Sequence, residues 1–257
     1  MVTQYIVSND GTRIAYDITG HGPALMLLHG AGKTRRDWHK AGYVERLKDD
    51  FTVLAVDVRG TGESDLLIDL ADYSIEKICD DLNLVTEACG IERFLVWGYS
   101  FGGNIARYLG AWSNRVEAAA VIGIPFGLAV DHEFDQLINE FVAKWQPLAE
   151  AYKTGAATEK EKRSVIKSRI PVWVACFQAM RTWPKILPED MRCPTLLLAG
   201  TKNQGARKWV EANQAALSNT KVEVKIINGL NHSQEFSKIE QVFPVVSAFF
   251  SRHRTAI

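Results

Sequence analysis

The most informative segment of the sequence is Phe94-Leu95-Val96-Trp97-Gly98-Tyr99-Ser100-Phe101-Gly102. An apolar run is followed by the pattern G-x-S-x-G and then by a helical pattern, which predicts a strand, a sharp turn and a helix. A serine in such a turn needs a positive φ, and the strand and helix pass so closely that only very small side chains fit two positions away. Gly98 and Gly102 meet this requirement. Ser100 is therefore a candidate nucleophile at the tip of the turn.

Elsewhere, apolar runs alternate with helical patterns, which is typical of a parallel sheet covered on both faces. Around Asn9-Asp10-Gly11 the chain is expected to open with an antiparallel hairpin. The expected strands cover residues 5–7, 13–18, 24–28, 52–56, 94–97, 118–122, 195–199 and 222–227. Substrates of such sheets bind beyond the carboxyl ends of the strands. Because His29, Ser100, Asn203 and His232 follow strand ends, we expect them at one rim.

A long insertion separates the sixth and seventh strands. It is too long for an ordinary connection, so it must carry structure of its own. Apolar residues recur at three- and four-residue steps from Phe134 to Leu148, which predicts an amphipathic helix. We expect residues 127–190 to form a helical cap over the site, inserted into a core formed by residues 1–126 and 191–257.

Four segments occur in an order that points to one superfamily: Leu25–Gly30, Asp57–Ser64, Gly98–Gly102 and Gly229–His232. Together they resemble the α/β-hydrolase superfamily, from about residue 4 to residue 250. The resemblance implies a mostly parallel sheet of eight strands, with Ser100 as nucleophile at a nucleophile elbow and His232 as general base. It also implies that the backbone N–H groups of Ala31 and Phe101 form the oxyanion hole.

The acid position departs from the family pattern. The family usually places an aspartate three residues after the glycine that ends the seventh strand, and here that position holds Asn203. Three interpretations are open: Asn203 orients His232 as a neutral surrogate, another carboxylate such as Asp131 in the cap has taken over, or turnover has been lost. Glu235, three residues after His232, is interpreted as belonging to the first turn of the final helix.

Composition restricts the function classes. The 257 residues contain 30 Lys plus Arg and 30 Asp plus Glu, so the formal net charge is zero. A neutral chain favours small neutral ligands over nucleic acid or an anionic membrane. No signal peptide, long apolar segment or metal-ligand spacing is recognisable, so we expect a cytoplasmic protein without metal or organic cofactor. The sequence leaves open whether the chain forms a homodimer. The turn from Asp57 to Ser64 is interpreted as structural, stabilised by an Asp–Arg interaction, rather than as a nucleotide site.

The expected function is hydrolysis of a small, rather apolar carboxylic ester or related acyl compound through a Ser–His acyl-enzyme, as in a carboxylesterase-like serine hydrolase. Epoxide hydrolases and haloalkane dehalogenases share the superfamily, but the resemblance implies an aspartate where this chain has Ser100. Perhydrolases, carbon–carbon bond hydrolases and thioesterases use the same serine–histidine pair and are not separated by sequence. The alternative, motivated by Asn203, is a noncatalytic or weakly hydrolytic ligand sensor.

Overall fold

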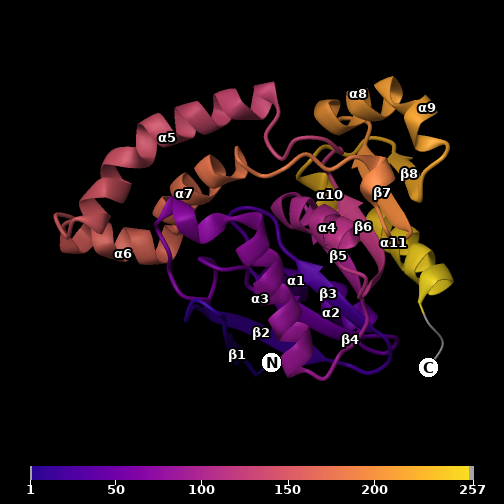
Figure 1. Ribbon diagram of the computed structural model, residues 1–257, viewed down its shortest axis with the longest axis horizontal. Coiled ribbons are helices and arrows are strands. Elements are labelled where there is room, and N and C mark those ends of the chain that lie inside the picture. Colours follow the sequence, from indigo (N-terminus) through magenta and orange to yellow (C-terminus); the bar gives the residue numbers. More distant parts are fainter. Residues whose placement is uncertain (1, 255–257) are drawn as a thin grey trace.

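The computed structural model describes residues 2–254 and contains one eight-stranded sheet (Figure 1). The strand order is β1-β2-β4-β3-β5-β6-β7-β8, antiparallel at β1/β2 and β2/β4 and parallel elsewhere. The strands are β1 (Gln4–Val7), β2 (Arg13–Thr19), β3 (Ala24–Leu28), β4 (Thr52–Val56), β5 (Phe94–Tyr99), β6 (Val116–Ile122), β7 (Thr195–Gly200) and β8 (Val222–Ile227). This confirms the predicted fold class, and every expected strand end lies within about two residues of the observed one.

Helices cover both faces of the sheet because its strands are apolar on both sides. One face packs against α3 (Ile75–Ala88) and α4 (Phe101–Trp112). The other packs against α1 (Arg35–Lys40), α2 (Tyr43–Leu47) and α11 (Ile239–His253), with the short α10 (Gln234–Ser237) before α11. Further helices are α8 (Gln204–Ala212), α9 (Gln214–Leu217) and the 3₁₀ turns η1 (Leu70–Tyr73) and η2 (Pro188–Asp190). Within residues 2–254, no helix is both long enough and apolar enough to cross a bilayer.

Three helices occupy most of the segment 127–190: α5 (His132–Lys153), α6 (Glu159–Ser168) and α7 (Ile170–Met180). Figure 1 shows them together at one side of the sheet, with the long α5 outermost. Phe177 of α7 packs edge-on against Phe134 and Phe141 of α5. An antiparallel bridge between Gly127 and Ile186 joins the two ends of the segment. The division of the chain into core and cap stays a prediction.

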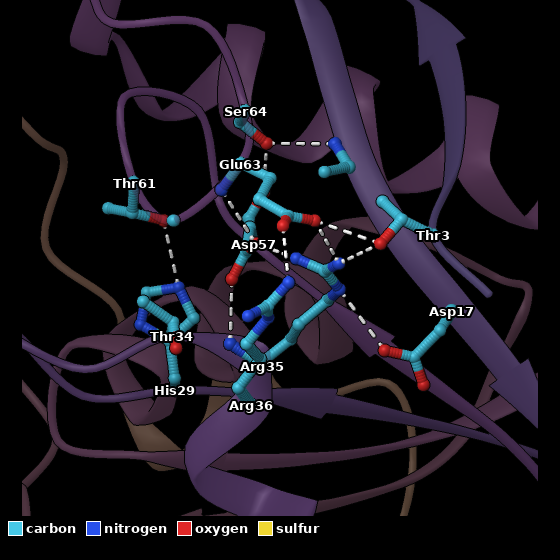
Figure 2. A network of polar contacts seen from close by, with 12 residues as sticks. Thr3, Asp17, His29, Thr34, Arg35, Arg36, Asp57, Thr61, Glu63 and Ser64 are labelled. Atoms are coloured by element: carbon cyan, nitrogen blue, oxygen red, sulfur yellow. Dashed lines mark hydrogen bonds and ion pairs between the residues drawn. The ribbon is translucent and has the colours of Figure 1, made fainter. Parts of the chain in front are cut away.

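The turn after β4 is held in place by a network of hydrogen bonds and ion pairs (Figure 2). Asp57 accepts hydrogen bonds from the backbone N–H groups of Arg35 (2.7 Å) and Glu63 (2.9 Å), and it forms an ion pair with the Arg35 guanidinium. Arg35 is fully buried and also contacts Asp17 at 3.1 Å. The Asp–Arg interaction that stabilises the turn is therefore formed by Arg35 of α1, which lies outside the turn. Removing one member of such a buried pair destabilises a protein by about 3–5 kcal/mol.

Candidate active site

Ser100 occupies the strained turn that the sequence predicts. It follows β5, precedes α4 and has φ 53° and ψ −113°. A Cβ atom on Gly98 would lie 2.0 Å from the carbonyl oxygen of Gly102, and one on Gly102 would lie 2.1 Å from that of Leu28. Neither position accepts a side chain. The backbone of the elbow therefore needs both glycines.

His232 meets Ser100 across the rim of the sheet. Its Nε2 lies 2.8 Å from Ser100 Oγ. The imidazole stacks on the ring of Tyr99, with centroids 5.3 Å apart, and the Tyr99 hydroxyl donates to the carbonyl oxygen of His232 at 3.0 Å. Burial and the negative charge of Glu235 raise the pKa of Tyr99 to about 12, so the hydroxyl stays a donor. Tyr99 thus holds the histidine from its face and from its backbone.

A carboxylate, that of Glu235, faces the other nitrogen of the imidazole. Its Oε2 lies 3.0 Å from His232 Nδ1, and its Oε1 accepts from the Gly200 N–H at 2.7 Å. The residue is only 1% exposed. A carboxylate at Nδ1 favours the tautomer with the proton on that nitrogen, which leaves Nε2 free to accept from Ser100. The expectation that Glu235 belongs to the final helix is wrong, because it lies buried in α10, before α11 begins.

Asn203 lies at this site but faces Glu235 with its amide nitrogen. Nδ2 donates to both carboxylate oxygens, at 2.9 and 3.0 Å, and to the carbonyl oxygen of Gly123 at 2.8 Å. Its Oδ1 caps α8 by accepting from the Ala206 N–H. Nδ2 is also 3.3 Å from His232 Nδ1, but an amide nitrogen cannot accept the imidazole proton. This contradicts the surrogate interpretation, since Asn203 supports the carboxylate instead of replacing it.

Asp131 does not fill the acid position either. Its carboxylate accepts from the Phe134 N–H at 2.8 Å and caps α5. The expectation that Asp131 faces His232 is therefore wrong, and the carboxylate that contacts the imidazole is that of Glu235. The signal that could have found Glu235 is its spacing: in a helical turn, a residue three positions after His232 lies on the same side as the histidine.

Gly123 at the end of β6 leaves the space for this pair. It has φ 84°, and a Cβ there would lie 2.5 Å from Glu235 Oε2 and 2.9 Å from the ring of His232. Any side chain at this position would push the carboxylate away from the imidazole and would also strain the backbone.

Two backbone N–H groups border Ser100 without an acceptor. Within residues 2–254, neither the Ala31 nor the Phe101 N–H is hydrogen-bonded, and both residues line the cavity beside Ser100. The turn that carries Ala31 is fixed by His29, whose Nδ1 donates to the Gly30 carbonyl oxygen at 2.9 Å while Nε2 accepts from the Val58 N–H at 3.3 Å. Burial lowers the pKa of His29, which favours the neutral ring that this arrangement requires.

The cavity in front of Ser100 has a volume of about 410 Å³, a size suited to a small molecule. Its walls are mostly apolar, and five residues of the segment 127–190 contribute large apolar side chains: Leu128, Phe134, Leu137, Phe177 and Met180. The titratable residues in its lining are His232 and the carboxylates Asp131 and Glu133. Among residues 2–254, no group of three or more His, Cys, Asp or Glu is placed to hold a metal ion.

Comparison with known families agrees with this architecture. The family model for the alpha/beta hydrolase fold matches residues 23–175, which is more than half of the chain. The chain therefore belongs to the alpha/beta hydrolase fold family, as its motifs predict.

Individual relatives match parts of the chain. An uncharacterized protein of Mycobacterium bovis is 38% identical over 96 residues, which are 37% of this chain and 27% of that protein. Bifunctional epoxide hydrolase 2 of Sus scrofa is 30% identical over 126 residues, 48% of this chain and 22% of that enzyme. The chain thus matches about a quarter of the length of these relatives. A thermophilic esterase from Thermogutta terrifontis, solved with malate bound, superposes with a TM-score of 0.76 over 99% of this chain and 100% of that one, at 22% identity, which shows a common fold.

Proposed function

We propose that the protein is a serine hydrolase that cleaves small, rather apolar carboxylic esters or related acyl compounds through an acyl-enzyme. The observation that carries the proposal is the continuous chain of contacts from Ser100 Oγ through the two ring nitrogens of His232 to the buried carboxylate of Glu235. The base is within hydrogen-bond distance of both the nucleophile and the orienting acid, which is the geometry that acyl transfer requires.

The steps follow from these contacts. His232 Nε2 takes the proton of Ser100 as Oγ attacks the substrate carbonyl, and Glu235 stabilises the imidazolium that forms. The free N–H groups of Ala31 and Phe101 receive the negative charge on the carbonyl oxygen. The imidazolium then protonates the leaving alcohol. Water, activated by His232, attacks the acyl-serine and releases the acid.

The serine at the elbow favours acyl transfer over epoxide opening, although one relative described above is an epoxide hydrolase. Attack of a serine oxygen on an epoxide carbon would give an ether. An ether has no carbonyl for water to attack, so the enzyme would not be regenerated. The buried Glu235 also removes the motivation for a noncatalytic sensor, which rested on the neutral Asn203. Thioesters, peracids and carbon–carbon bonds stay alternatives within the serine class.

The function is tested by labelling with a fluorophosphonate probe together with a panel of p-nitrophenyl esters of rising chain length. We expect stoichiometric labelling and turnover, because the probe reacts with an activated serine. Absence of both labelling and turnover would reject the hydrolase and restore the sensor.

Asn203→Asp is expected to lower kcat/KM rather than raise it. The new carboxylate would stand about 3 Å from that of Glu235, where two like charges repel strongly. We expect a loss of about 10–100-fold and a lower unfolding temperature, measured on one short-chain ester and by thermal denaturation. A gain in turnover would return Asn203 to the acid position.

A further inference from the structure

Besides Ser100 and His232, the cavity is lined by four residues with polar side chains, namely Asn104, Asp131, Glu133 and Asn203, and Asn104 is the buried one among them. Asn104 lies one helical turn after Ser100 on α4, and its backbone N–H bonds to the Ser100 carbonyl oxygen at 3.0 Å. It is 6% exposed and lines the cavity together with Ser100. A buried amide normally has partners for its donors as well as for its acceptor.

The orientation of this amide is fixed by Arg107. The guanidinium is fully buried and donates through Nη2 to Asn104 Oδ1. Through Nη1 it donates to the carbonyl oxygens of Pro125 (2.6 Å) and Gly127 (3.4 Å). An arginine has only donors, so the amide oxygen must face it and the amide nitrogen must point away. Burial lowers the pKa of Arg107 to about 10, which still leaves the guanidinium charged at neutral pH.

The amide nitrogen is consequently a free donor. Within residues 2–254, Asn104 Nδ2 has no hydrogen-bond partner, and it keeps accessible surface. Since the cavity is the space that Asn104 lines, a ligand in the cavity is the group that can pair with Nδ2. Leaving a donor unpaired on ligand binding weakens binding substantially.

We propose that Asn104 Nδ2 is a specificity-determining donor, and that the preferred substrate carries a neutral acceptor oxygen, such as an ether or ketone, in the chain that fills the cavity. This inference rests on the proposed hydrolase function. A neutral acceptor is favoured over a carboxylate because the charged residues that line the cavity, Asp131 and Glu133, repel anions.

The test compares substrates that differ by one oxygen in place of a methylene. On the acyl side, p-nitrophenyl 3-methoxypropanoate is paired with the pentanoate, and 4-methoxybutanoate with the hexanoate. On the alcohol side, 2-ethoxyethyl acetate is paired with pentyl acetate. Each ratio of kcat/KM is divided by the ratio of the hydroxide-catalysed rates. We expect wild type to prefer the oxygen-containing partner in at least one pair by about tenfold.

Asn104→Asp keeps an acceptor for Arg107 and removes the donor, so the ratio should fall to about one or below. Asn114→Asp is the matched control: Asn114 also accepts from an arginine, Arg192, at 3.1 Å, but it lies outside the cavity, and its ratio should stay that of wild type. A wild-type ratio of about one in every pair would overturn the inference. A preference for the oxygen-containing substrate that folded Asn104→Asp retains would overturn it as well. In both cases, turnover of the esters would still support the proposed hydrolase function.

Binding of non-hydrolysable analogues tests the role of Asn104 without turnover. The N-methylamides of 3-methoxypropanoic and pentanoic acid are titrated into Ser100→Ala, with and without Asn104→Asp, by ligand-observed NMR. Tighter binding of the methoxy compound that disappears in the double variant supports the donor role. Equal binding of the two amides, if no ester pair shows a preference either, rejects it.

Discussion

Ser100→Ala is expected to abolish fluorophosphonate labelling and to lower kcat by about 10⁶, because no other nucleophile replaces the oxygen that attacks the carbonyl. The folded state should keep its stability, since the serine side chain lies at the rim and contributes no core packing. Its hydrogen bond to His232 Nε2 is the contact that disappears.

The matched control is Ser113→Ala at the other end of α4. Ser113 is half-buried like Ser100 but lies outside the cavity, so its variant should be labelled and should turn over esters at the wild-type rate. Equal activity of Ser100→Ala and wild type would refute the assignment of the nucleophile.

Glu235→Gln should lower kcat by about 10⁴, or roughly 5 kcal/mol of transition-state stabilisation. The amide cannot stabilise the imidazolium, and its NH₂ group can donate to Nδ1 and so select the wrong tautomer. It would also present donors, or a single weaker acceptor, to the Gly200 N–H and to Asn203 Nδ2, both of which now point at the carboxylate. The measurement is kcat and KM on one short-chain ester.

Two further variants serve as a control for Glu235→Gln and as a test of the other candidate acid. Glu240→Gln, an exposed residue paired with Arg46, is the same chemical change outside the site and should leave kcat unaffected. Asp131→Asn tests the alternative acid in the cavity. A collapse of activity in Asp131→Asn, with Glu235→Gln close to wild type, would show that the geometry around His232 has been misread.

The fold is predictable from sequence because its signals are local. Runs such as Leu25–Leu28 and Leu196–Ala199 are apolar without alternation, which is typical of strands covered on both faces. Gly98 and Gly102 report a close approach of two backbones that no other residue would permit. Together these signals fix the sheet, the elbow and the rim at which Ser100 and His232 meet.

The acid could not be placed in the same way because its burial depends on tertiary contacts. Asn231, Ser233 and Gln234 make the surroundings of Glu235 polar, so the segment resembles an exposed helix start. The carboxylate is buried only because the N–H of Gly200 and the amide of Asn203 come from another strand end to meet it. Asn203 at the expected acid position indicated in the sequence that the acid lies elsewhere. The carboxylate that it contacts, Glu235, became apparent only in the three-dimensional structure.

The orientation of Asn104 is likewise a tertiary property. Asn104 and Arg107 are the polar residues of an otherwise apolar helix, which marks them as unusual in sequence. The direction of the amide, however, follows from the carbonyl oxygens of Pro125 and Gly127 that hold the guanidinium in place.

An acyl-enzyme on Ser100 can be detected by rapid acid quenching of wild type mixed with p-nitrophenyl acetate, followed by peptide mass spectrometry. We predict one acetyl group on the peptide that contains Ser100, appearing within the first turnover and absent from Ser100→Ala. Turnover with no acyl group on Ser100, or with the acyl group on a different residue, would contradict the mechanism.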